Sequence, residues 1–142
     1  MLKKYLEKAK SITKNTDAVF AFVSENKEIT SCKKGIGFVA SLCNNGEDLS
    51  SGAVSDKIVG KAAALLFTLL GVKLIHAETA SEGAIEVFER YGIEYTFDIK
   101  TKAIVNRTGD GLCPMENAVR DIDSPKDALA AINKTLERLI NS

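Results

Sequence analysis

Residues 57–77 read KIVGKAAALLFTLLGVKLIHA, and this stretch decides the fold that the sequence predicts. The segment 57–70 is apolar on nearly every side of a helix, with Lys57, Lys61 and Thr68 as its only polar stripe. Gly71 is a typical helix terminator, and the apolar residues 72–77 then predict a buried strand. A helix with so little polar surface must be covered by other elements, so the rest of the chain is expected to pack around it.

The flanking sequence supplies those elements. Apolar residues recur at helical spacing near both ends of the chain, and short runs rich in strand formers lie between them. The predicted helices are residues 2–12, 35–43, 57–70, 82–91, 114–120 and 125–140, and the predicted strands are 18–23, 28–32, 72–77, 93–97 and 103–105.

This order of elements predicts one α/β domain spanning residues 1–142. Helices alternate with strands around a largely buried sheet, which is typical of a three-layer α/β/α sandwich. We expect a mixed five-stranded sheet, in which residues 93–97 and 103–105 form an antiparallel pair joined by a tight connection.

Composition excludes several classes of protein. Nineteen basic and nineteen acidic residues give no net charge, so there is no strong signal for nucleic-acid binding. The longest apolar run, residues 62–72, is too short for a membrane span. One histidine and three scattered cysteines cannot form a standard zinc quartet, and no cofactor motif is present. The odd number of cysteines argues against a complete disulfide framework, and with no targeting segment visible we expect a cytoplasmic protein with reduced thiols.

Two stretches carry a resemblance to a known family. They are residues 56–64, DKIVGKAAA, and residues 113–116, CPME. Together with the order of elements over residues 5–120, they resemble an uncharacterised prokaryotic family, a domain of unknown function, that is placed in the cytidine-deaminase-like superfamily. The resemblance implies that two inner helices begin side by side over the sheet, where deaminases of that superfamily hold a zinc ion.

The zinc ligands of the resembled superfamily are missing here. Its first inner helix opens with Cys or His and a catalytic Glu, whereas the matching stretch here is Val54 to Ile58. Its second inner helix opens with Pro-Cys-x-x-Cys, and the matching positions here are Ala80, Ser81 and Ala84. Serine and alanine cannot replace thiolates, so the chain is expected to bind no metal there.

The two helix starts remain candidate anion sites. Asp56 and Lys57 are expected at the start of the first inner helix, Lys61 one turn later, and Ser81 at the start of the second. Free N–H groups and two lysines there would suit a small anionic or nucleotide-like metabolite. The alternatives are a solvated lysine stripe, with Asp56 as a cap, and a Ser81 that only caps its helix.

A second candidate chemistry centres on Cys113. It is expected at the N-cap of a short helix, with Pro114 and Glu116 inside that helix, and such a position lowers a thiol pKa. Arg107 in the preceding loop would assist, and His76 or Glu116 would carry the proton. The alternatives are a buried structural cysteine and a structural histidine.

These observations lead to three hypotheses. The first is metal-free binding of a small anionic or nucleotide-like metabolite, and the second is an enzyme, a transferase or hydrolase, with Cys113 as nucleophile. The third is a non-catalytic module that forms homo-oligomers, for which the helices at residues 2–12 and 129–140 would extend an interface.

Overall fold

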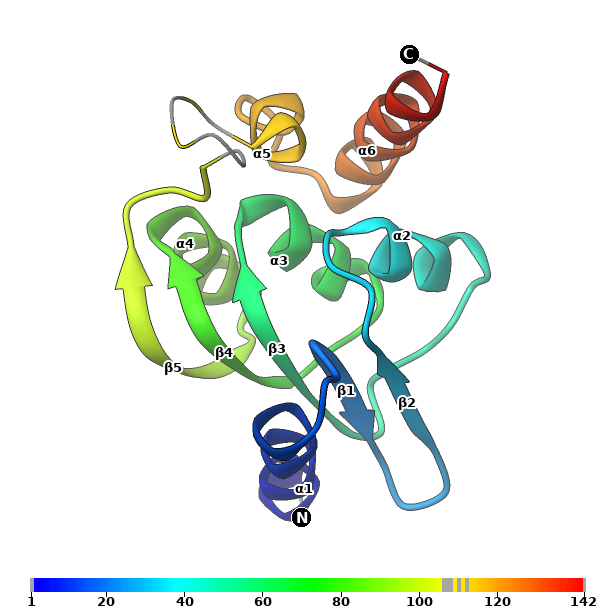
Figure 1. Cartoon of the computed structure of the whole chain (residues 1–142), viewed down its shortest axis with the longest axis vertical. Helices are drawn as coiled ribbons and strands as arrows, with labels where there is room; N and C mark the ends of the chain where they lie inside the picture. Colours follow the sequence, from blue (N-terminus) through cyan, green and yellow to red (C-terminus); the bar gives the residue numbers. More distant parts are fainter. Residues whose placement is uncertain (1, 106–108, 110, 112, 142) are drawn as a thin grey trace.

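The computed structural model describes residues 2–105, 109, 111 and 113–141. They form a mixed sheet and a set of helices (Figure 1). The helices are α1 (Leu2–Asn15), α2 (Gly37–Asn44), α3 (Lys61–Leu69), α4 (Glu82–Tyr91), α5 (Pro114–Ala118) and α6 (Pro125–Ile140), and the strands are β1 (Phe20–Val23), β2 (Glu28–Ser31), β3 (Ala53–Val59), β4 (Leu74–Ser81) and β5 (Glu94–Thr101).

The sheet has the strand order β2-β1-β3-β4-β5. β1 pairs antiparallel with β2 and with β3, whereas β3, β4 and β5 run parallel. An α/β fold with a mixed five-stranded sheet is therefore confirmed.

Helices cover both faces of the sheet. Alternate residues of each central strand point to opposite sides, and apolar side chains on each side pack against a helix. Val54 and Ile75 belong to the main core with α3, whereas their neighbours Ala53 and Leu74 pack with Leu6 of α1. Helix α1 also contacts β1 and lies on the face away from α3 and α4 (Figure 1). One face of the sheet is thus covered chiefly by a single helix.

The predicted helix 57–70 is wrong in its first turn. Residues 53–59 form β3, and the helix begins only at Lys61. Gly60 is the N-cap, with extended backbone angles (φ −101°, ψ −175°), so it is not a mid-helix glycine. The β-branched pair Ile58-Val59 favours a strand, and pairing with β1 and β4 on either side stabilises it.

The predicted pair of strands 93–97 and 103–105 is also wrong. Residues 94–101 form one strand that pairs parallel with β4 throughout, and residues 103–105 are not part of the sheet. The segment 98–101 was expected to be a connection, but its alternation of polar and apolar residues is equally compatible with a strand. β4 likewise runs past Ala77 to Ser81, so His76 lies within the strand and does not end it.

Several local predictions are confirmed. Ser81 and Ser124 are N-caps whose hydroxyl oxygens accept bonds from Ala84 and Asp127, and Gly92 ends α4 in the left-handed conformation (φ 70°). Among the described residues, no helix combines the length and apolar character needed to cross a bilayer.

Candidate functional site

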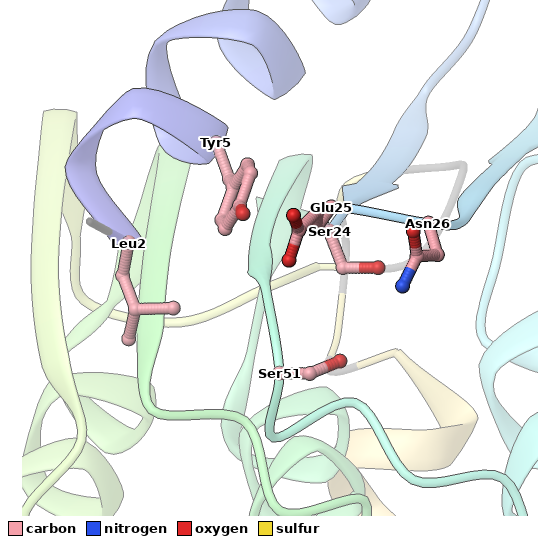
Figure 2. Close-up of a pocket in the computed structure, with 6 residues that line it drawn as sticks. All are labelled: Leu2, Tyr5, Ser24, Glu25, Asn26 and Ser51. Atoms are coloured by element: carbon pink, nitrogen blue, oxygen red, sulfur yellow. The ribbon is translucent and has the colours of Figure 1, made fainter.

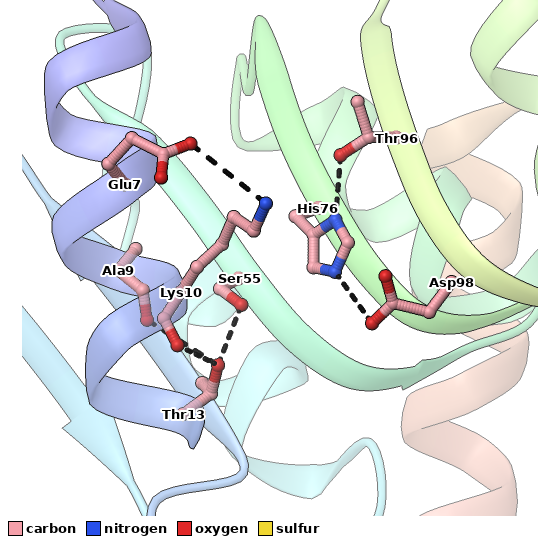
Figure 3. Close-up of polar contacts among 8 residues, drawn as sticks. All are labelled: Glu7, Ala9, Lys10, Thr13, Ser55, His76, Thr96 and Asp98. Atoms are coloured by element: carbon pink, nitrogen blue, oxygen red, sulfur yellow. Dashed lines mark hydrogen bonds and ion pairs between the residues drawn. The ribbon is translucent and has the colours of Figure 1, made fainter. Parts of the chain in front are cut away.

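A polar cavity of about 370 Å³ lies between the C-terminal half of α1 and strands β3–β5 (Figure 3). Its lining residues are Lys10, Thr13, Lys14, Lys57, His76, Glu78 and Asp98. All of them are polar, and they come from α1 and from three neighbouring strands. The cavity is therefore the main concentration of titratable side chains on this face of the sheet.

Strand register builds the floor of the cavity. Ser55, His76 and Thr96 are opposite one another on β3, β4 and β5, and Lys57, Glu78 and Asp98 form the next row. In the row before them, Ala53 and Leu74 are apolar and pack under α1, whereas Glu94 on the edge strand β5 is exposed. Along β3 and β4 the side chains on this face are thus apolar in the first row, polar in the second and charged in the third.

Helix α1 is fixed to this floor by a buried hydrogen bond. The hydroxyl oxygens of Thr13 and Ser55 lie 2.8 Å apart, and both side chains are buried. Thr13 also donates toward backbone carbonyls of its own helix, at Lys10 and Ala9. This contact sets the depth at which Lys10 and Lys14 stand above the strands.

His76 is the best-positioned chemical group in the cavity. Its side chain is only 5% exposed, Nδ1 lies 2.6 Å from the Thr96 hydroxyl, and Nε2 lies 3.3 Å from the Asp98 carboxylate. A neutral ring with its proton on Nε2 satisfies both partners, because Nε2 then donates to Asp98 and Nδ1 accepts from Thr96. The pair fixes the ring orientation as Figure 3 shows.

The lysines give the cavity an uncompensated positive side. Among the described residues, Lys14 and Lys57 form no salt bridge, and Lys10 reaches only Glu7, at 3.9 Å on the same helix. Three lysines therefore face two carboxylates, so the lining carries one more positive than negative charge, and the hydrogen bond from neutral His76 leaves the charge of Asp98 in place. A small anion would restore the balance.

Asp56 lies beside the cavity on β3 and points to the opposite face of the sheet from Lys57. Burial raises the pKa of its carboxyl to about 8, and the nearby charge of Glu78 adds to this effect. Backbone N–H groups of Lys57 and Ile58 hydrogen-bond to the carboxylate and oppose the rise in pKa. Asp56 is not a helix cap, because no helix begins there.

The predicted anion site at the helix starts is occupied by the protein itself. The Glu116 carboxylate of α5 accepts hydrogen bonds from the backbone N–H groups of Lys61 and Ala62, both 2.8 Å long. The Lys61 amine donates to the carbonyl of Arg120 at 3.0 Å and lies 3.5 Å from Asp123. The start of α3 is therefore capped from within the chain.

Helices α3 and α4 do begin side by side, as the resemblance implied. A Cβ placed on Gly83 would lie 3.2 Å from Cβ of Lys61. Ser81 caps α4 through its 3.0 Å bond from the Ala84 N–H, which matches the structural alternative. Lys57 is not at this point, because it lies on β3 before the start of α3 and lines the cavity on the α1 face of the sheet.

Comparison with known proteins places this geometry in a family. Residues 8–136 match the family described as TM1506: domain of unknown function (DUF1893). The chain belongs to the DUF1893 family. Its structure is similar to the crystal structure of a DUF1893 family protein (TM1506) from Thermotoga maritima, with 28% identity, a TM-score of 0.84, and 97% of this chain and 92% of that chain covered. No curated protein matches the chain.

The structure of this DUF1893 chain separates the residues of the predicted Cys113 chemistry. Cys113 is the N-cap of α5 and packs against the main core, whereas His76 lies on the α1 face of the sheet. Glu116 accepts hydrogen bonds from the backbone at the start of α3, and Arg107 lies outside the described residues. The structure does not bring Cys113 and His76 together as a pair.

Sequence reasoning missed most of the residues around His76. The predicted helix 2–12 includes Lys10 but ends before Thr13 and Lys14, and the sequence assigns Thr96 to a strand and Asp98 to a connection. The signal that was available is the alternation of polar and apolar side chains in residues 94–100. If this segment is a strand, Glu94, Thr96, Asp98 and Lys100 share one face, the face that carries His76.

A second hollow of this DUF1893 structure, about 270 Å³, lies at the other end of α1 (Figure 2). Its lining residues are Leu2, Tyr5, Ser24, Glu25, Asn26 and Ser51. It contains one titratable carboxylate and no histidine or lysine, so it lacks the chemistry of the cavity at His76. Within the described part of the chain, no group of three or more His, Cys, Asp or Glu side chains is suited to a metal ion.

Proposed function

We propose that this DUF1893 protein binds a small anionic ligand, carrying a phosphate or carboxylate group, in the cavity above His76. The observation that carries the proposal is the convergence of Lys10, Lys14 and Lys57 on one cavity whose floor holds a buried, oriented histidine. A site of about 370 Å³ falls in the range of small-molecule pockets, so a nucleotide-like ligand is compatible with it.

The roles of the residues follow from their positions. Lys57 approaches from the sheet and the two α1 lysines from above, so an anion between them would meet cations on two sides. His76, held by Asp98 and Thr96, supplies a fixed edge against which a ligand is oriented. The hydroxyls of Thr13 and Ser55 bond to each other and contribute to the wall rather than to recognition.

We also propose that the architecture is a three-layer α/β/α sandwich of the cytidine-deaminase-like type. The strand order, the N-terminal helix and hairpin, and the adjacent starts of α3 and α4 support this assignment. In the resembled superfamily these helix starts hold a metal, whereas here the Glu116 carboxylate occupies the start of α3. This supports a metal-free member whose ligand site lies on the opposite face of the sheet.

The proposal is tested by isothermal titration calorimetry with inorganic phosphate, citrate and AMP. Lys57→Ala removes one cation of the cavity and is expected to weaken the best of these ligands at least about tenfold, as loss of a charge-assisted contact does. Lys4→Ala, on an exposed part of α1, is the matched control and should leave the affinity unchanged. Absence of binding for all three ligands, or equal affinity in both variants, would refute the proposal.

A further inference from the structure

Strand β5 is a long and unprotected edge. It has 8 residues and, within the part of the chain that the structure describes, pairs only with β4, whereas the opposite edge strand β2 has 4 residues. In Figure 1 no described element lies beyond β5. Its register with β4 is continuous, with no bulge, and it contains no proline. Proteins usually protect such an edge, because its free N–H and C=O groups can pair with another strand.

The two faces of β5 differ in character. Tyr95, Phe97 and Ile99 lie on the α4 side, where the Tyr95 ring packs on Phe88 and on Phe97. Phe97 is 39% exposed and Ile99 is 60% exposed, which is unusual for large apolar side chains on a sheet. Glu94, Thr96, Asp98 and Lys100 alternate with them on the α1 side.

Symmetry limits how two copies of β5 can pair. A two-fold axis between antiparallel edge strands must run perpendicular to the sheet, so each face of one copy continues the same face of the other. One residue of β5 must then lie opposite itself. Phe97 and Asp98 are the two residues nearest the middle of the strand, so they give the registers of greatest overlap.

Charge selects between these registers. With Asp98 on the axis, two carboxylates would be directly opposite, which destabilises the pair. With Thr96 on the axis, which gives a shorter overlap, Glu94 would be opposite the partner's Asp98, again a contact between like charges. With Phe97 on the axis, every cross-strand contact is complementary: Phe97 with the partner's Phe97, Tyr95 with the partner's Ile99, Thr96 with the partner's Asp98, and Glu94 with the partner's Lys100.

We propose that two copies of this chain associate through antiparallel pairing of their β5 strands, with Phe97 on the two-fold axis, to form one continuous ten-stranded sheet. The interface has an apolar strip of Tyr95, Phe97 and Ile99 on the α4 side and two Glu94–Lys100 ion pairs on the other. It also extends the floor of the His76 cavity, because the partner's Asp98 lies beside Thr96. The association does not depend on which ligand, if any, the cavity binds.

Sedimentation velocity from about 5 to about 500 µM tests the association, because a small interface is expected to dissociate within this range. The wild-type chain should shift from monomer to dimer. Phe97→Lys places two ammonium groups on the axis and should raise the dissociation constant at least about a hundredfold, with an unchanged circular dichroism spectrum. A wild type that stays monomeric throughout, or a Phe97→Lys variant that dimerises normally, would overturn the proposal.

A charge swap tests the register. Glu94→Lys and Lys100→Glu each turn two attractive contacts into repulsive ones and should each weaken the dimer about tenfold. The double variant restores both contacts and should recover wild-type affinity, whereas Lys102→Glu, just outside the strand, is the control and should change little. Failure of the double variant to recover affinity would exclude this register, and with it the proposal.

Discussion

The contact between Glu116 and the start of α3 allows a quantitative prediction. Each carboxylate oxygen accepts one backbone N–H, from Lys61 and Ala62, at 2.8 Å. Hydrogen bonds to a charged group contribute about 1.5–3 kcal/mol each, and the two bonds share one carboxylate, so their sum is less than additive. We expect Glu116→Ala to lower the free energy of unfolding by about 3 kcal/mol.

Gly60 makes the same contact possible. A Cβ at this position would lie 2.4 Å from Oε1, 2.6 Å from Cδ and 2.8 Å from Oε2 of Glu116. Gly60→Ala should therefore displace the carboxylate and cost about 2 kcal/mol, close to the loss of the bonds themselves. The backbone angles of Gly60 are extended and suit alanine, so the cost comes from the collision with Glu116 and not from the backbone.

A double-mutant cycle tests whether the cost of Gly60→Ala comes from the collision with the Glu116 carboxylate. Once Glu116 is replaced by alanine, the methyl group added at position 60 has nothing left to displace, and Gly60→Ala should be nearly neutral. The double variant should then lose about 3 kcal/mol, and the coupling energy should be about 2 kcal/mol. Urea unfolding followed by circular dichroism measures all four proteins, provided that the m-value stays constant.

The matched control is Glu82→Ala in the first turn of α4. Glu82 is exposed and favours its helix mainly through the dipole, so its loss should cost less than about 1 kcal/mol. Additivity of the Gly60 and Glu116 effects within about 0.5 kcal/mol would refute the reasoning, and so would a Glu116→Ala cost no larger than that of the control.

Buried polar and ionisable groups give three other predictions. Because burial raises the folded pKa of Asp56 to about 8, the folded state binds more protons than the unfolded state between about pH 4 and pH 8. The free energy of unfolding should therefore fall as the pH rises through this range. In urea unfolding at several pH values, Asp56→Asn should make this fall smaller by about 1–3 kcal/mol. Thr13→Val leaves the buried Ser55 hydroxyl without its partner and should cost about 1–2 kcal/mol, whereas Thr13→Val added to Ser55→Ala should cost much less. In iodoacetamide labelling followed by mass spectrometry, exposed Cys32 should react before Cys43, because burial raises the Cys43 pKa to about 11; faster labelling of Cys43 would contradict this.

The sequence predicts the elements whose signals are local. Helix caps at Ser81 and Ser124, the stop at Gly92 and the N-cap position of Cys113 all depend on residues within one turn of each other, and all are confirmed. The boundary between β3 and α3 is different, because the apolar residues of both elements follow one another with only Gly60 and Lys61 between them. Periodicity alone assigns such a continuous run to one helix.

The error in the boundary between β3 and α3 explains why the sequence predicts the candidate site at the helix starts, whereas the cavity lies on the α1 face of the sheet. Moving the helix start from residue 57 to residue 61 takes Lys57 off the helix and places it on the sheet face that also carries His76. Strand register then decides which side chains are neighbours, and register depends on pairing between segments about twenty residues apart. No feature local to Lys57, His76 or Asp98 shows that they line one cavity.

The position of the cavity follows from how this chain satisfies its helix starts. Both inner helices are capped from within the chain: Ser81 accepts the Ala84 N–H at the start of α4, and Glu116 accepts the N–H groups of Lys61 and Ala62 at the start of α3. The other face of the sheet is covered mainly by α1, whose C-terminal half lines the cavity together with Lys57. Polar side chains of that row stay accessible while their strands are held rigidly by the core behind them. A rigid floor under a single helix is the reason why the proposed anion site lies on this face and not at the helix starts.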